Sequence, residues 1–236
     1  MKSSVNERGT VAASICLLTV GAVIAAIAPW GIGLNAVPVH SSALRVCLII
    51  AMGATGLFFA RRTGLHIVPT GLLHPVRVAV LIGAALAAYL LLIDGMIFRS
   101  ALPPDYVTMI VSLGLPDRLA YFMLRSFSDG IVYQLFFGST FVWLMGLTWR
   151  RADGRIAPGA YWSGLILGHI LNVFINLIAI AGPPVTALVL TYDVLRFVAP
   201  GVLWAYLYRR HGLTTTLVAH AATHVFLQPL LGVALG

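Results

Sequence analysis

Long apolar runs constrain the fold of this chain more than any other feature of its sequence. Seven such runs cover roughly residues 10–30, 43–60, 77–98, 118–148, 158–181, 185–208 and 213–235. A helix of about 20 apolar residues is long enough to cross the hydrocarbon core of a bilayer. Lipid offers no partner to open backbone groups, and the runs lack the alternation of membrane β-strands, so each run is predicted to be a helix. The sequence therefore predicts an all-α, multi-pass membrane bundle of seven spans.

The composition favours a single membrane domain over residues 1–236. Hydrophobic residues make up 60% of the chain, charged residues 9%, and the mean hydropathy is +0.96, whereas an ordinary soluble domain is about half apolar. The formal net charge of +8 lies mostly in the short loops between the runs. It therefore indicates topology, and no nucleic-acid partner is predicted. Membrane lipids are the expected surroundings, and the sequence leaves the oligomeric state open.

Basic residues are distributed unevenly between the two ends of the predicted spans. With the amino terminus in the cytoplasm, the cytoplasmic side carries Lys2, Arg8, Arg61, Arg62, Arg77, Arg150, Arg151, Arg155, Arg209 and Arg210. The other side keeps Arg45, Arg99 and Arg118. Because basic residues favour cytoplasmic loops, we expect the amino end inside and the carboxyl end outside, in a plasma (inner) membrane.

Two segments are expected to depart from straight spanning helices. The run at 118–148 is too long for one straight crossing and contains Gly130 and Gly138, so a kink, a tilt or an extension is expected. Residues 102–116 contain three prolines and a glycine, which favours a loop or a short surface helix.

Polar residues recur at helical spacing inside two of the apolar runs. His220, His224 and Gln228 are four residues apart and share one face of the last run. His169, Asn172 and Asn176 form a similar stripe on the fifth run. Because polar groups that face lipid stay unsatisfied, the two stripes predict a polar chamber inside the bundle.

Two carboxylates, Asp129 and Asp193, are expected at membrane depth, whereas Asp94 is placed near the outer end of its span. Arg196 follows Asp193 by three residues, which favours an ion pair on one helix. Arg125 precedes Asp129 by four residues. Asp129 could therefore pair with Arg125 or face the histidine stripes, and the pattern does not distinguish the two.

The end of the chain carries the clearest resemblance to a known family. Residues 203–224 read LWAYLYRRHGLTTTLVAHAATH. This stretch resembles the carboxyl-terminal signature of the CPBP membrane proteins, the CAAX-prenyl-protease and bacteriocin-processing family, also called the Abi family. In that family a helix end rich in Tyr and Arg and a Gly precede a helix that carries His-x-x-x-Asn.

Two upstream stretches resemble the other motifs of the family in the same order. Residues 165–169 read LILGH and resemble its Phe-x-x-x-His motif, and Asn172 lies where the family often has an Asn. Residues 129–138 read DGIVYQLFFG and lie where the family has Glu-Glu-x-x-x-Arg and an aromatic-Gly tail. The resemblance covers residues 118–228, which we treat as a CPBP-like core.

The resemblance implies an intramembrane endopeptidase. Its substrate would be a membrane-associated peptide, or a prenylated or lipid-embedded carboxyl-terminal segment. Asp129 and His169 would activate the water, with Asn172 beside them in the motif, and His220 and His224 would bind water or hold the oxyanion.

The chain departs from the family pattern at four positions that carry polar side chains in the family. The two family glutamates are Asp129 and Gly130, the arginine is Gln134, and the asparagine of the last motif is His224. The only glutamate in the chain is Glu7, so no shifted alignment restores the pair. A shorter carboxylate moves its oxygen by about 1.5 Å, a displacement that is costly in rate.

The same residues could instead form a metal site. Asp129, His169, His220 and His224 supply one carboxylate and three imidazoles, a set suited to zinc or another divalent ion. A metal-bound water would then replace the missing glutamate. A metal-free polar chamber is the other interpretation, and no further cofactor is predicted.

Two other functions stay open at this point. The joint loss of Glu, Glu and Arg is typical of a degenerate family member that acts as a scaffold, immunity or chaperone-like membrane protein. A small metal or proton carrier could use the same chamber, although carriers usually show internal repeats and interrupted helices in matching halves, which this sequence lacks.

Overall fold

The computed structural model describes residues 2–28, 39–69, 73–179 and 186–236, and these residues form helices without any strand. An isolated bridge joins Arg150 to Ile156. The helices are α1 (Lys2–Ile27), α2 (Ser42–Thr63), α3 (Leu73–Leu92), η1 (Ile93–Ile97), η2 (Arg99–Ala101), α4 (Pro104–Ser112), α5 (Leu115–Asp129), η3 (Gly130–Gly138), α6 (Ser139–Thr148), α7 (Pro158–Ala179), α8 (Ala187–Asp193), η4 (Val194–Val198), α9 (Ala199–His211) and α10 (Leu213–Leu235).

Six helical stretches are long enough and apolar enough to cross a membrane. They are Gly9–Ile27, Ser42–Thr63, Leu73–Ile97, Leu115–Thr148, Ala187–His211 and Leu213–Leu235. Helix α7 fills the fifth predicted run with 22 residues but is not one of these six. The carboxyl-terminal ends of the first and fifth predicted runs and the amino-terminal end of the sixth extend beyond the described residues. The prediction of an all-helical membrane protein is thus confirmed.

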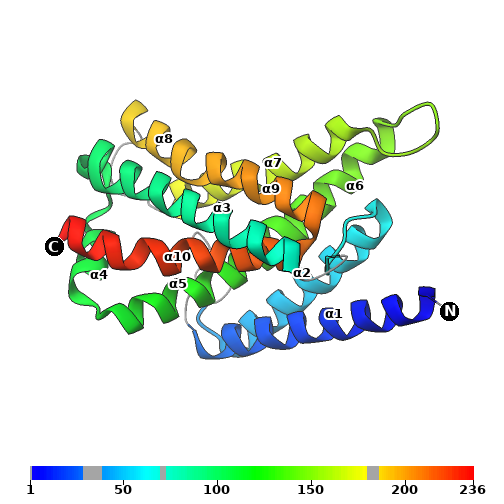
Figure 1. Ribbon diagram of the computed structural model, residues 1–236, viewed down its shortest axis with the longest axis horizontal. Coiled ribbons are helices and arrows are strands. Elements are labelled where there is room, and N and C mark those ends of the chain that lie inside the picture. Colours follow the sequence, from blue (N-terminus) through cyan, green and yellow to red (C-terminus); the bar gives the residue numbers. More distant parts are fainter. Residues whose placement is uncertain (1, 29–38, 70–72, 180–185) are drawn as a thin grey trace.

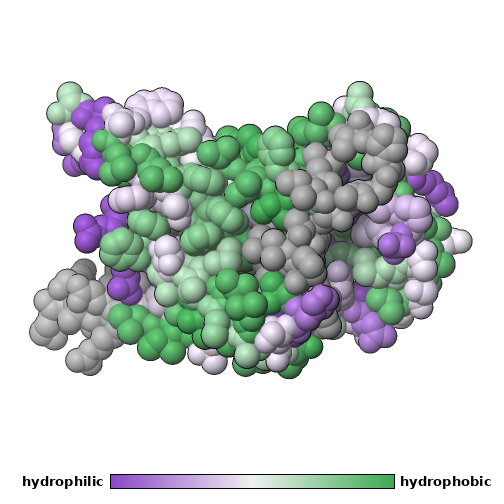
Figure 2. All heavy atoms as spheres, turned by 180° about the vertical axis from the view of Figure 1, so that it is seen from behind, coloured by the Kyte–Doolittle hydropathy of each residue, from purple (hydrophilic) through white to green (hydrophobic). Residues whose placement is uncertain are grey.

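The surface agrees with a lipid environment. Hydrophobic side chains cover the middle of the face drawn in Figure 2, and hydrophilic side chains gather mainly toward its two ends. Large apolar residues such as Leu81 on α3 and Val233 on α10 are 71% and 84% exposed. Side chains of this kind are costly in water but not against acyl chains.

The long fourth run is irregular, as its length suggested. A π-helical segment, η3, separates α5 from α6, and it begins at Gly130 and ends at Gly138. Two shorter π-helical segments, η1 and η4, interrupt the spans that contain Asp94 and Arg196. Such segments are rare and often occur at functional sites, because the wider turn redirects the side chains that follow. The proline-rich stretch after η2 forms the short helix α4, as predicted.

Helix α10 lies in the middle of the bundle and packs against α3, α5 and α9 (Figure 1). Gly83 allows α3 to lie close against α10, because a Cβ at that position would lie 2.7 Å from Ala222 Cβ and 2.8 Å from Ala219 O. Helix–helix contacts in lipid depend on such small residues, which let two backbones approach closely. The polar stripe of α10 is therefore held inside the bundle.

Candidate functional site

A cavity of about 260 Å³ lies inside the bundle, and all five residues predicted for the site line it. Asp129 comes from the end of α5, His169 and Asn172 come from α7, and His220 and His224 come from α10. Asn176, the third member of the α7 stripe, has a side chain outside the described residues. The helices that were expected to meet around a polar chamber therefore do meet.

The ring of Trp204, on α9, lies close to the rings of both His220 and His169. Its ring centroid is 4.0 Å from that of His220 and 6.0 Å from that of His169. Both histidines are buried, with 8% and 3% of their surface exposed. Gly201, one turn before Trp204 on α9, makes room for His169, since a Cβ there would lie 2.8 Å from His169 Cβ. The face of α9 thus fixes the position of both rings.

His224 continues the row of rings toward α5. Its centroid lies 5.4 Å from that of His220, and its ring stacks on Phe122 at 4.9 Å. The Nδ1 atom of His224 lies 3.4 Å from Nε2 of Gln228, which is fully buried one turn later. The predicted stripe of α10 is therefore a continuous polar row.

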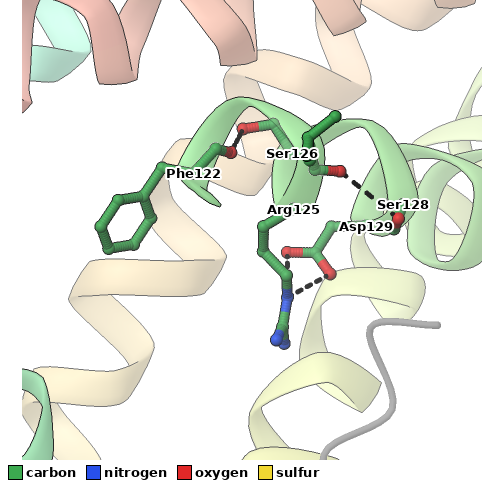
Figure 3. A network of polar contacts seen from close by, with 6 residues as sticks. Phe122, Arg125, Ser126, Ser128 and Asp129 are labelled. Carbon is green, nitrogen blue, oxygen red and sulfur yellow. Dashed lines mark hydrogen bonds and ion pairs between the residues drawn. The ribbon is translucent and has the colours of Figure 1, made fainter. Parts of the chain in front are cut away.

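Asp129 is paired with Arg125 on its own helix. Arg125 Nε donates to both carboxylate oxygens of Asp129, at 3.1 Å and 3.4 Å, and both side chains line the cavity (Figure 3). Ser126 and Ser128, in the same turn of α5, bond back to the carbonyls of Phe122 and Leu124. Of the two alternatives for Asp129, the structure shows the intrahelical ion pair, at the edge of the chamber that holds the histidines.

The ion pair expected between Asp193 and Arg196 is wrong. Arg196 Nη1 instead lies 3.0 Å from Oδ2 of Asp94, on the neighbouring span. Arg196 falls within the π-helical segment η4, where backbone bonds run from i to i+5, so the three-residue spacing no longer puts it beside Asp193. Asp94, expected near the outer end of its span, is fully buried.

Two tyrosines complete this network around Asp94. Tyr192 OH donates to Asp94 Oδ1 at 3.1 Å and accepts a hydrogen bond from Arg196 Nη1. Tyr106 OH, on α4, donates to Asp94 Oδ2 at 3.3 Å. Burial raises the pKa of the Tyr106 phenol to about 12, so its hydroxyl stays protonated and available as a donor. Sequence reasoning missed this network, because its members lie on three separate segments and share no spacing.

Four buried polar atoms around the cavity have no hydrogen-bond partner within the described part of the chain. They are Gln134 Oε1, Asp193 Oδ2, Trp204 Nε1 and His220 Nδ1. A buried polar group without a partner costs about 1–3 kcal/mol, and native proteins contain few of them. Their concentration on one cavity indicates that its contents are polar.

The predicted metal ligands do not fit a metal ion in their present arrangement. Among the described residues, no three His, Cys, Asp or Glu side chains are grouped so that they could hold one. Asp129 is engaged by Arg125, and His224 is stacked on Phe122 beside Gln228. A metal site needs several ligands converging on one point at about 2 Å, so we derive no metal-assisted step.

Comparisons with known proteins add no identification, since no family model, curated protein or solved structure matches the chain.

Proposed function

We propose that this chain is an intramembrane hydrolase that cleaves a peptide bond of a membrane-associated substrate inside the cavity. One observation carries the proposal. The five residues selected for chemistry by their sequence motifs, on three separate helices, line one cavity whose remaining lining is largely apolar. A peptide or a prenylated or lipid-embedded carboxyl-terminal segment is the substrate class, as in the CPBP family that the motifs resemble.

The chemistry assigned to the site is attack by water on a carbonyl carbon. His169, assisted by Asp129, accepts the proton of the attacking water, and the oxygen of that water bonds to the carbonyl carbon. The proton then passes to the leaving amine as the C–N bond breaks. His220 and Trp204 each have a buried ring nitrogen that finds no partner among the described residues, and a donor in that position can bind the developing oxyanion.

The proposal includes a topology of seven spans in the plasma membrane, in which α7 is added to the six apolar helices. The amino end would lie inside and the carboxyl end outside. Basic loops support this orientation. Arg150, Arg151 and Arg155 are exposed in the loop between α6 and α7, which lies at the same end of the molecule as the amino terminus (Figure 1). Two of the three arginines assigned to the outer side are instead internal: Arg45 donates to Ala25 O at 2.8 Å, and Arg118 donates to Ile110 O.

A second candidate is a non-catalytic family member that acts as a scaffold, immunity or chaperone-like membrane protein. The Arg125–Asp129 pair favours it, because the guanidinium occupies both carboxylate oxygens, which would otherwise be available to a water molecule. The absence of both glutamates of the CPBP motif also favours this non-catalytic candidate.

Hydrolysis can be tested with purified protein in liposomes that contain membrane-anchored peptides, with and without a prenyl group. Mass spectrometry in ¹⁸O-labelled water identifies hydrolysis, since the new carboxylate gains one labelled oxygen. We expect His169→Ala and His220→Ala each to lower the rate by about 10²–10⁴-fold, as general acid–base groups do. His66→Ala is the matched control, because His66 is exposed at the end of α2.

Equal cleavage by the wild type and by folded His169→Ala protein would contradict the catalytic assignment. If the wild type cleaves none of the peptides while a folded Asp129→Ala variant retains the cellular phenotype of the wild type, the non-catalytic alternative is favoured instead.

A further inference from the structure

Asp193 is the acidic side chain of the cavity that makes no close ion pair within the described residues, since Arg196 acts on it only from a longer distance. It lies at the end of α8, is 4% exposed, and its Oδ2 has no hydrogen-bond partner in the described part of the protein. The arginine three residues later, Arg196, is directed to Asp94. Asp193 therefore stays beside the cavity as a buried carboxylate that is not neutralised.

The formal charges around the cavity do not cancel. The lining itself carries two arginines and two aspartates, but Arg196 is paired with Asp94, which is buried behind the lining, and Arg125 is paired with Asp129; an ionised Asp193 carboxylate therefore leaves one negative charge in excess in this region. An uncompensated charge inside a membrane bundle is costly, and such residues usually have a partner or a ligand. The charge complementary to this excess is a single positive one.

The aromatic side chains near Asp193 already bind a cation. The guanidinium carbon of Arg196 lies 4.4 Å from the ring centroid of Tyr106, 5.6 Å from that of Tyr192 and 5.7 Å from that of Phe197. All three rings also line the cavity together with Asp193. Aromatic rings that line a cavity together with a carboxylate are a setting in which proteins bind ammonium groups.

We propose that Asp193 binds the positively charged nitrogen of an organic cation that occupies the cavity. The ligand class is an ammonium group, carried either by a lipid headgroup or by the basic side chain of a peptide. The volume of about 260 Å³ suits such a group, since it is slightly below the roughly 300–1,000 Å³ of pockets for drug-sized ligands. Binding needs no hydrolysis, so this inference stands independently of the proposed function.

The test is calorimetric titration of the purified protein in a non-ionic detergent with choline and with n-butylammonium, both as chlorides. The neutral analogue 3,3-dimethyl-1-butanol, in which carbon replaces the choline nitrogen, is the control ligand. We expect the wild type to bind at least one of the two cations at least tenfold more tightly than the neutral alcohol. Preference for choline would indicate a lipid headgroup, and preference for n-butylammonium would indicate a basic side chain.

Variants locate the site. Asp193→Asn keeps the size of the side chain and should weaken binding at least tenfold, whereas Asp193→Glu, which keeps the charge, should retain it within a few fold. Asp117→Asn removes an exposed carboxylate at the start of α5 and should leave binding unchanged.

Several results would overturn the proposal: equal binding of choline and its neutral analogue, equal binding of sodium and the organic cations, or unchanged binding by Asp193→Asn. If Asp193→Asn does not fold, the comparison of choline with the neutral alcohol on the wild type still decides the question.

Discussion

The ion pair between Asp94 and Arg196 should be one of the strongest single determinants of stability in this protein. It joins the span that contains η1 to the span that contains η4, with its charged atoms 3.0 Å apart. The Asp94 side chain is fully buried, and that of Arg196 is 14% exposed. Removing one partner of a buried pair leaves the other charge uncompensated, which costs about 3–5 kcal/mol.

The two single substitutions should lower the free energy of unfolding by different amounts. In Asp94→Asn, Arg196 keeps a nearby carboxylate in Asp193, so we expect a loss of about 3 kcal/mol. In Arg196→Met, Asp94 and Asp193 both lose their nearest cation, and the expected loss is about 5 kcal/mol. The double variant removes the buried pair as a unit and should be more stable than Arg196→Met alone.

Equilibrium unfolding measures these values, with sodium dodecyl sulfate titrated into detergent micelles and followed by circular dichroism. Asp153→Asn is the control, because Asp153 pairs with Arg151 and Arg155 at 3.8 Å on an exposed loop. Such exposed pairs contribute about 0–1 kcal/mol.

A double-mutant cycle decides whether the pair acts as described. Coupled residues give interaction energies well above the roughly 0.5 kcal/mol error of additivity. If the Asp94→Asn and Arg196→Met effects add within that limit, or if Asp94→Asn matches the Asp153→Asn control, the reasoning from buried charge is refuted.

Two glycines near the site give further predictions. Gly130→Glu, which would place a carboxylate at the second acidic position of the CPBP motif, should lower the free energy of unfolding by about 1–3 kcal/mol, because a Cβ there would lie 2.2 Å from Leu217 Cδ2 and Leu217 must turn away to admit the side chain. Leu217→Ala should recover part of this loss, and an unchanged unfolding midpoint of Gly130→Glu would contradict this cause. Gly201→Ala should displace the His169 ring and cost about 1–3 kcal/mol of unfolding free energy. Gly95→Ala is the control, because its new Cβ would lie at an ordinary 3.5 Å from Ala234 Cβ, and its unfolding free energy should stay near that of the wild type. Equal losses of stability in the two alanine variants would argue against the close contact at His169.

The fold class could be predicted from the sequence because lipid leaves so few solutions for apolar runs of this length. The same reasoning located the irregularity at Gly130 and Gly138 and the short helix at Pro104–Ser112. It could not foresee π-helical segments, since the backbone chooses i to i+5 bonds for reasons of packing that spacing does not encode. The pairing of Arg196 was predicted wrongly for this reason, because helical arithmetic assumes a regular α-helix.

The spacing argument placed the histidines on one cavity but gave the wrong ion pair, because the histidines lie on the uninterrupted α-helices α7 and α10. Regular spacing there placed His169, His220 and His224 on one cavity. At one position where the chain departs from the CPBP motif, Gly130, an added Cβ would lie 2.2 Å from Leu217 Cδ2, so a glutamate fits there only if Leu217 turns away. Asp193, which also lines the cavity, has no counterpart in any of the motifs.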